Sequence, residues 1–173
     1  MKFTIKKCIK NLIKDIISPK MPINIRGNSL VIEGSDYYNS MDLHIGVTTS
    51  SGAIVEFDKN GLRRHRSGQW GQCLLLDQAP GPWTEHWDKA LLQICKQKCW
   101  SAKSYSEHKH NCYSFVLTFL VSLNYGNLSS AARSRTTFCE KFIVPRTTSA
   151  GKYISLYRKL KEHDFYIHRN KTG

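Results

Sequence analysis

The sequence predicts a single α+β domain in which an antiparallel sheet packs on helices. The chain has 173 residues, 40% of them hydrophobic and 11% aromatic, which suits one folded domain with a sizeable core. Residues 42–58 alternate apolar and polar side chains around a glycine-containing turn, a pattern typical of a β-hairpin. Two later segments, 83–100 and 112–123, repeat apolar residues with the spacing of one buried helix face.

The N-terminal stretch carries a basic amphipathic pattern. Residues 1–17 place apolar side chains on one face of an expected helix and lysines on the other. Such a helix can dock on the core or lie on an anionic membrane. A mitochondrial presequence is a third option, but presequences favour arginine and this segment has none. Leu30, Val31 and Ile32 then predict one strand.

The hairpin carries the first candidate site residue, His44. Expected strands at 42–48 and 53–57 flank the turn. A three-residue loop would place Glu56 opposite His44, and a shift of one residue would place Phe57 there instead. A histidine on a strand is most often structural, so its role depends on whether another reactive group faces it.

Local patterns also indicate the remaining elements. A basic stretch at 59–70 opens with an Asn-Gly turn, and Arg63, Arg64 and Arg66 are suited to gripping phosphates. Trp70 is suited to stacking on a base, although a solvated turn explains the same stretch. Further along we expect a strand at 74–76, a helix at 83–100 capped by Thr84, a short helix from Leu128, an amphipathic segment at 138–144, a turn-rich basic loop at 145–151, a helix at 153–160 and a strand at 164–168.

The cysteine and histidine spacing raises the question of a zinc site. Cys95 and Cys99 would lie one helical turn apart, and His108, His110 and Cys112 follow. The spacing matches no standard zinc pattern, and the C-terminus of a helix is electrostatically poor for thiolates. We therefore predict no metal site and no cofactor.

The net charge and the spacing of the cysteines limit which partners and which cell compartment suit this protein. Lys and Arg exceed Asp and Glu by 13, and the pI is about 9.6. This surplus favours an acidic protein or an anionic membrane surface as partner, and nucleic acid with less support; a solvated basic surface explains it equally well. We find no secretory signal and no apolar run long enough to span a membrane. Irregularly spaced cysteines without a signal are typical of reduced thiols, which predicts a cytoplasmic or nuclear protein.

The sequence around Cys112 is suited to a nucleophile. Asn111 is a good helix N-cap, so Cys112 would lie in the first turn of the helix at 112–123. Free N–H groups and the helix dipole favour a thiolate there, and one of these N–H groups can stabilise an oxyanion. The alternative is a small, buried and inert cysteine, which is the commoner fate of a free cysteine.

A catalytic cysteine also needs an imidazole within hydrogen-bond reach and a third group that orients the imidazole. His44 meets the first need if the helix packs against the sheet. Glu56, or with less support Asp42, is the orienting group. His108 and His110 compete for the role of base, but both lie close to Cys112 in sequence and need a tight turn to reach it.

Several separate motifs resemble the makorin-2 opposite strand protein family. They are Asp42–Val47, His110–Tyr113, Phe142–Thr147, Lys152–Tyr157 and Phe165–Ile167. The resemblance runs from about residue 41 to 168, so it implies a variable basic N-terminal segment at 1–40 and a family domain at 41–173. The family has no settled biochemical activity, so the resemblance does not supply a function.

A second, more general resemblance concerns the order of the motifs. A histidine on a hairpin, followed by Asn-Cys at a helix start, is similar to circularly permuted papain-like folds of the lecithin retinol acyltransferase and permuted deubiquitinase types. This resemblance implies a permuted papain-like arrangement. It also implies that Cys112 is the nucleophile, His44 the base and Glu56 the orienting residue.

Two hypotheses of function follow. The preferred one is a non-catalytic interaction protein that keeps a papain-like scaffold and binds through its basic face, because no substrate-binding motif is readable. The alternative is a cysteine hydrolase or acyltransferase in which Cys112 attacks an acyl or isopeptide carbonyl. The two hypotheses differ in whether Cys112 lies within reach of His44 and remains accessible. Oligomeric state and substrate are not predicted.

Overall fold

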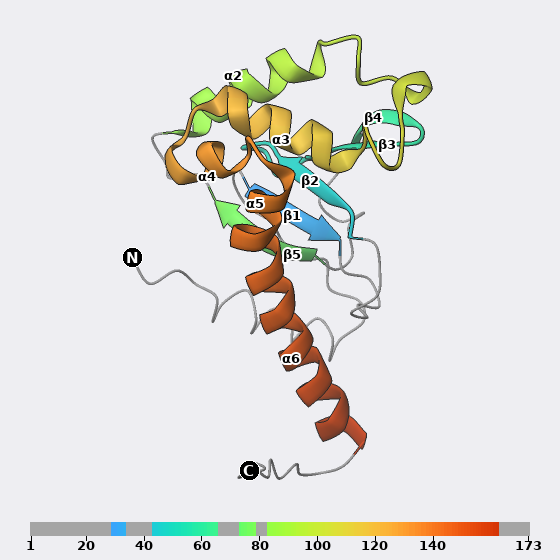
Figure 1. The fold of residues 1–173 in the computed structure, drawn as a ribbon, viewed down its shortest axis with the longest axis vertical. Coiled ribbons are helices and arrows are strands. Elements are labelled where there is room, and N and C mark those ends of the chain that lie inside the picture. Colours follow the sequence, from blue (N-terminus) through green and yellow to red (C-terminus); the bar gives the residue numbers. More distant parts are fainter. Residues whose placement is uncertain (1–28, 34–42, 66–72, 79–82, 163–173) are drawn as a thin grey trace.

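The computed structural model describes residues 29–33, 43–65, 73–78 and 83–162. In this part of the chain, antiparallel strands form one five-stranded sheet in the order β4-β3-β2-β1-β5 (Figure 1). The strands are β1 (Ser29–Glu33), β2 (Ile45–Thr48), β3 (Ile54–Asp58), β4 (Gly61–His65) and β5 (Cys73–Gln78). The prediction of a single α+β domain with an antiparallel sheet is confirmed.

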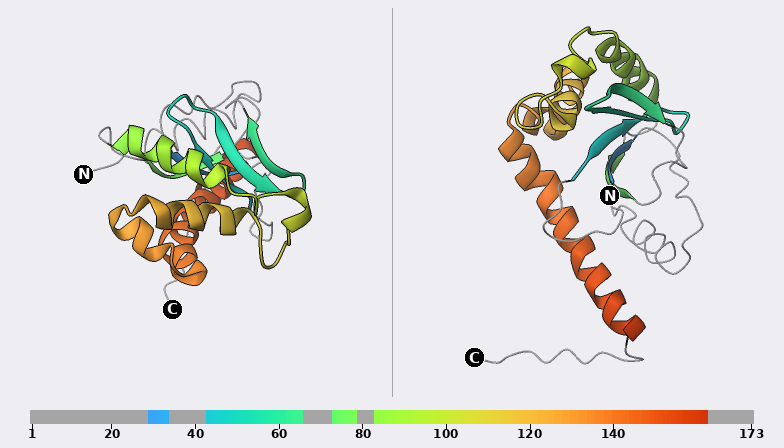
Figure 2. Two further views of the ribbon diagram at one scale, coloured as in Figure 1. Left: turned by 90° about the horizontal axis from the view of Figure 1, so that it is seen from above. Right: turned by 90° about the vertical axis from the view of Figure 1, so that its right-hand side faces the viewer.

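The helices follow the sheet in sequence. They are α2 (Thr84–Cys95), a 3₁₀ turn (Ala102–Ser104), α3 (Cys112–Leu123), α4 (Gly126–Ala131), α5 (Arg135–Phe138), a π-helical turn (Cys139–Ile143) and α6 (Val144–Glu162). Helices α2 and α3 pack on each other, and α3 packs on β2 and β3. Helix α6 continues from the π-helical turn and extends away from the rest of the described structure (Figures 1 and 2). No helix among the described residues is long and apolar enough to cross a membrane.

The core lies between the sheet and the two packed helices. One face of the β2–β3 hairpin contributes buried apolar side chains, and α2 and α3 contribute aromatic and aliphatic ones. The indole of Trp87 on α2 also donates a hydrogen bond to the Thr48 carbonyl, which ties the helix to the end of β2. The core includes Ile45, Val47, Val55, Phe57, Trp87, Leu91, Phe115, Val116, Phe119 and Leu120. This packing holds the N-terminus of α3 against the hairpin.

Most expected elements are confirmed within the described residues. The strands at 30–32 and 74–76 are β1 and β5, and the predicted hairpin is β2 and β3. The helix at 112–123 is α3, and the short helix from Leu128 lies in α4. Strand β1 comes from the expected N-terminal segment and lies between β2 and β5, so this part of the segment belongs to the sheet. A boundary at residue 40 stays a prediction, and the expected helix at 1–17 and strand at 164–168 lie outside the described residues.

The loop expected at 145–151 is wrong, because this stretch belongs to α6. Pro145 is the second residue of α6 and directly follows the π-helical turn, so the wider π-helical geometry lies immediately before the residue that lacks an N–H group. The hydroxyl of Thr147 donates to the Ile143 carbonyl, and that of Ser149 donates to the Pro145 carbonyl. These side chains therefore bond to the helix backbone instead of interrupting it.

Two other expectations need correction. The helix expected at 83–100 ends at Cys95, and Trp83 rather than Thr84 occupies its N-cap position, without a side-chain cap bond. The chain turns after Cys95 because Trp100 packs into the core beside Phe57.

The solvated turn expected over 59–70 needs correction in its described part, since residues 61–65 form β4. Gly61 opens this strand with φ +93°, and a Cβ there would lie 3.0 Å from the backbone nitrogen of Ala102. Its lack of a side chain thus permits the close approach of the 3₁₀ turn. Strand β4 pairs with β3 along its length, so its polar residues belong to the sheet and not to a free turn.

Candidate functional site

The candidate site begins at the N-terminus of α3. The side-chain oxygen of Asn111 accepts hydrogen bonds from the backbone N–H groups of Tyr113 at 3.1 Å and Ser114 at 3.4 Å. Its amide nitrogen donates to the carbonyl of Glu107, which anchors the cap to the preceding loop. The expected N-cap is therefore confirmed. Cys112 is consequently the first helical residue, where the helix dipole favours negative charge.

Cys112 lies at the edge of the core but is not sealed. The residue keeps 7% of its surface exposed. Its side chain forms a hydrogen bond with the imidazole of His44. The backbone N–H of Cys112 has no hydrogen-bond partner among the described residues, since the cap oxygen serves the next two N–H groups. An acceptor placed beside the sulfur therefore finds a free donor at the helix start.

His44 joins the cysteine to a carboxylate. Its Nε2 donates to Glu56 Oε2 at 2.6 Å, which leaves Nδ1 as the ring nitrogen for the Cys112 thiol. Burial lowers the pKa of His44, but hydrogen bonds to Cys112 and Glu56 and the negative charge of both groups outweigh this and raise the pKa to about 10. The imidazole therefore carries a proton at neutral pH, and this positive charge lies between a sulfur and a carboxylate.

Glu56 is a buried carboxylate whose two oxygens are both occupied. The residue is only 3% exposed. Oε2 accepts from His44, while Oε1 accepts from His65 Nε2 at 2.5 Å and from Arg63 at 3.1 Å. Burial raises the pKa of this carboxyl, but the hydrogen bonds and charges of His44 and His65 lower it below the ordinary value of a glutamate. Glu56 is thus held as an anion that fixes the His44 ring.

The register of the hairpin explains how these residues meet. Val47 pairs with Val55 and Thr48 with Ile54. Extended by one residue, this register places Gly46 opposite Glu56, and it places neither Glu56 nor Phe57 opposite His44, so both registers considered from the sequence are wrong. His44 precedes Gly46 by two residues and shares its side of the strand, and it reaches Glu56 diagonally.

The competing bases are placed elsewhere. His110 stacks on Trp100 with 4.7 Å between ring centroids, and its Nε2 lies 3.0 Å from the Cys99 carbonyl. His108 is exposed on the loop before α3. Neither contributes to the hydrogen bonds and charges that act on His44. Asp42, the alternative orienting residue, lies outside the described part of the chain.

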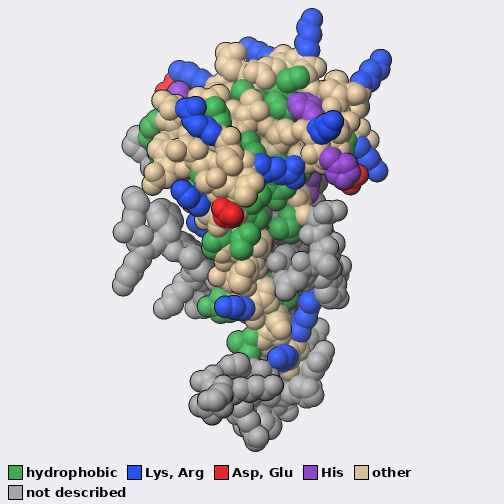
Figure 3. All heavy atoms as spheres, viewed as in Figure 1, with side chains coloured by type: hydrophobic (Ala, Val, Ile, Leu, Met, Phe, Trp, Pro, Cys, Tyr) green, Lys and Arg blue, Asp and Glu red, His purple; other side chains and the backbone are tan. Residues whose placement is uncertain are grey.

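The arginines of the expected basic cluster do not share one side of β4. Arg63 donates to Glu56 and forms an ion pair with Asp58 at 2.7 Å, so its guanidinium is engaged within the protein. Arg64 is the next residue on β4, and Arg66 and Trp70 lie outside the described residues. On the face shown in Figure 3, the Lys and Arg side chains are spread over the surface rather than gathered in one patch. The role of this cluster in binding stays a prediction.

Sequence reasoning missed His65. Its ring is the second imidazole on Glu56, and it lies on β4, two residues after Arg63 and on the same side of the strand. The sequence signal for it is the alternation of residues 61–65, but an arginine-rich stretch after Asn-Gly fits a solvated turn equally well. Chemically, the arrangement is a cysteine sulfur, an imidazolium and a buried carboxylate in series, with a free N–H at the helix start. This is the constellation that nucleophilic acyl chemistry requires.

Comparisons with known proteins support the family predicted from the motifs. The family model described as DUF4796 C-terminal matches residues 27–160. The human MKRN2 opposite strand protein is 34% identical over 138 residues, which cover 76% of this chain and 60% of that protein. The chain thus aligns with less than two thirds of this relative. No solved structure matches. The chain therefore belongs to the DUF4796 C-terminal family and is a relative of the MKRN2 opposite strand protein.

Proposed function

We propose that this protein is a thiol-dependent acyl hydrolase or acyltransferase on a permuted papain-like scaffold, with Cys112 as nucleophile. The observation that carries the proposal is that one imidazole, His44, bonds both Cys112 and the buried carboxylate of Glu56. A scaffold that only binds a partner does not require these three groups in series. Because of this geometry, we prefer the enzyme to the non-catalytic interaction protein that the sequence alone favours.

The first half of the reaction forms an acyl-enzyme. The Cys112 sulfur, whose proton is held by His44, attacks as a thiolate on the carbonyl carbon of an ester, thioester or amide, and a new carbon–sulfur bond forms. The carbonyl oxygen takes up negative charge, which the free backbone N–H of Cys112 is positioned to stabilise. As the bond to the leaving group breaks, the protonated His44 donates its proton to that group.

The second half restores the enzyme. His44 has lost its proton and now accepts one from water, or from the acceptor alcohol or amine, as that molecule attacks the thioester carbon. The carbon–sulfur bond breaks, the acid, ester or amide leaves, and the imidazolium again faces the sulfur. Glu56 keeps the imidazole oriented through both steps, because His65 and Arg63 hold its other oxygen.

The test is covalent labelling resolved to single cysteines. The full chain is treated with limiting iodoacetamide at pH 7, and modified peptides are quantified by mass spectrometry. We expect Cys112 to react faster than Cys99, although Cys99 is exposed and Cys112 is mostly buried. His44→Asn should abolish the preference, while Lys98→Gln, an exposed change beside Cys99, should leave it intact.

A second measurement tests turnover. With p-nitrophenyl acetate we expect a burst of nitrophenol equal to the enzyme concentration and an acetyl group on the Cys112 peptide. Cys112→Ala should lack both, whereas Cys99→Ala should keep both. If Cys112 reacts no faster than the other cysteines and no acyl adduct forms, the proposal is wrong.

A further inference from the structure

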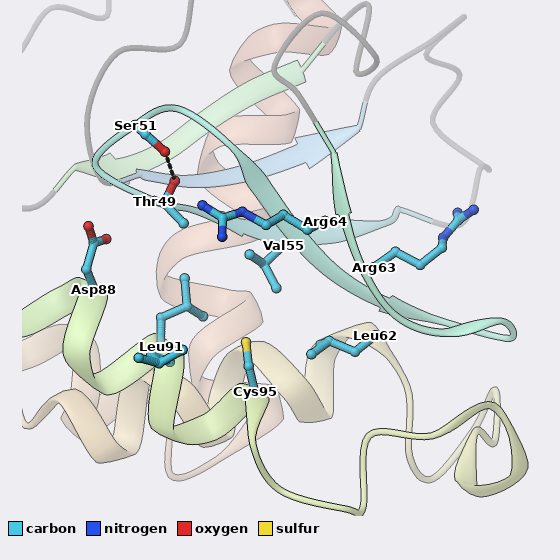
Figure 4. A pocket seen from close by; sticks show the side chains of 10 residues that line it. Thr49, Ser51, Val55, Leu62, Arg63, Arg64, Asp88, Leu91 and Cys95 are labelled. Atoms are coloured by element: carbon cyan, nitrogen blue, oxygen red, sulfur yellow. Dashed lines mark hydrogen bonds between the residues drawn. The ribbon is translucent and has the colours of Figure 1, made fainter.

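A second site lies beside the hairpin and outside the thiol centre. A hollow of about 350 Å³ opens between strands β3 and β4 and helix α2 (Figure 4). Neither Cys112, His44 nor Glu56 lines it. Its volume is at the lower end of the range for small-molecule sites. The catalytic constellation therefore does not account for this hollow.

The lining of the hollow is mostly aliphatic. Val55 and Leu62 come from the sheet, and Leu91, Leu92 and Cys95 come from α2. Leu92 is 56% exposed, the largest exposed fraction among the large hydrophobic side chains of the described residues. Figure 4 shows Leu91, Val55 and the Cys95 sulfur directed toward the same space. An alkyl chain bound here removes apolar surface from water without leaving any polar group unpaired.

One cationic side chain reaches across the hollow. The Arg64 side chain extends over Val55 toward the turn at Thr49, whereas the Arg63 side chain points the opposite way (Figure 4). The ion pairs and hydrogen bonds of Arg63 go to Glu56 and Asp58, and Arg64 has no such partner among the described residues. Arg64 therefore offers a planar fork of donors to an anion.

The nearby carboxylate forms no ion pair with Arg64 in the described part of the chain. Asp88 also lines the hollow, but it accepts hydrogen bonds from both the backbone N–H and the hydroxyl of Ser50. The hydroxyls of Thr49 and Ser51 bond to each other at 2.9 Å and are thereby also engaged. A ligand in the hollow thus meets the Arg64 guanidinium beside an aliphatic floor, with the Asp88 carboxylate at the end of α2 that faces Ser50.

We propose that this hollow binds a small aliphatic carboxylate, with the carboxylate on Arg64 and the alkyl chain on the floor. A peptide suits the lining less well, because its amide groups would lie against aliphatic side chains without hydrogen-bond partners. The proposal is independent of the thiol chemistry. A Cys112→Ala variant binds the same ligand.

The test uses decanoate as probe and isothermal titration calorimetry on the full chain, below the micelle concentration. We expect saturable binding of decanoate at one site. Arg64→Gln should weaken it at least about tenfold, as expected from the loss of charge-assisted hydrogen bonds. Leu92→Glu, which adds a negative charge at an exposed position, should weaken it to a similar degree. Lys96→Gln, an exposed change on the same helix end, is the matched control and should leave affinity unchanged.

A chemical footprint gives a second readout of the same site. Decanoate should slow alkylation of Cys95, which lines the hollow, and should not affect Cys99, which does not. Two results would overturn the proposal. One is decanol binding as tightly as decanoate with no effect of Arg64→Gln, which would remove the carboxylate from recognition. The other is the absence of saturable decanoate binding and of Cys95 protection.

Discussion

Replacing Glu56 by glutamine is the sharpest test of the buried ion network. The carboxylate is 3% exposed and serves His44, His65 and Arg63 at once. Glutamine keeps the shape but removes the charge, and its amide nitrogen must then face a donor. Breaking a buried ion pair by removing one partner costs about 3–5 kcal/mol. Because the side chain of His44 is 24% exposed, we expect the lower end, roughly 3 kcal/mol.

The pH dependence of this loss has a defined sign. The lowered pKa of Glu56 contributes stability that is present above about pH 4.5 and is lost as pH falls through its folded-state pKa. The pKa of His44, raised from 6.5 to about 10, contributes stability that is complete below pH 6.5 and is lost as pH rises through 10. The difference between wild type and variant should therefore be largest between pH 4.5 and 6.5 and shrink on both sides.

Urea unfolding followed by circular dichroism at several pH values measures this difference. A loss of 3 kcal/mol corresponds to a fall in Tm of roughly 6–12 °C for a chain of this size. Glu140→Gln is the matched control, since this glutamate is exposed and its change should stay within about 0.5 kcal/mol. A Glu56→Gln loss below 1 kcal/mol, or one that is constant from pH 4 to pH 10, would refute the network described above.

Three further predictions follow from the same geometry. Asn111→Ala should destabilise the protein by about 1 kcal/mol because two N–H groups of α3 lose their acceptor, and Asn111→Ser should restore most of it in urea unfolding. Gly61→Ala should cost about 1–3 kcal/mol, since the residue has φ +93° and the new Cβ would lie 3.0 Å from the Ala102 nitrogen; an unchanged Tm would contradict this close approach. His44→Asn should slow iodoacetamide labelling of Cys112 at least about tenfold at pH 7. Equal labelling rates in the variant and the wild type would show that His44 does not activate Cys112.

Local sequence patterns were sufficient for the helix that positions Cys112. An N-cap asparagine and apolar residues at helical spacing act within one turn or one face, so they are legible without the rest of the fold. The hairpin was predictable for the same reason, since alternation and a glycine turn with φ +80° at Gly52 are local properties.

Local patterns were misleading where the same residue types are common both in turns and in helices or strands. Pro145, Ser149 and Gly151 indicate a turn in isolation, but Pro145 lies at a helix start and Ser149 bonds back to the helix carbonyls. The arginines of β4 indicated a solvated turn, but Arg63 lies beside two carboxylates on the neighbouring strand and is neutralised there.

The sequence by itself determined the class of fold, the family and the place of Cys112 in the first turn of a helix, because each follows from neighbouring residues or from motif order. Only the tertiary structure decided that His44 reaches both Cys112 and Glu56, and that His65 shares the carboxylate. These contacts depend on strand register and on the packing of α3 against the hairpin. A one-residue slip of that register would turn Glu56 to the other face, and no local signal determines it.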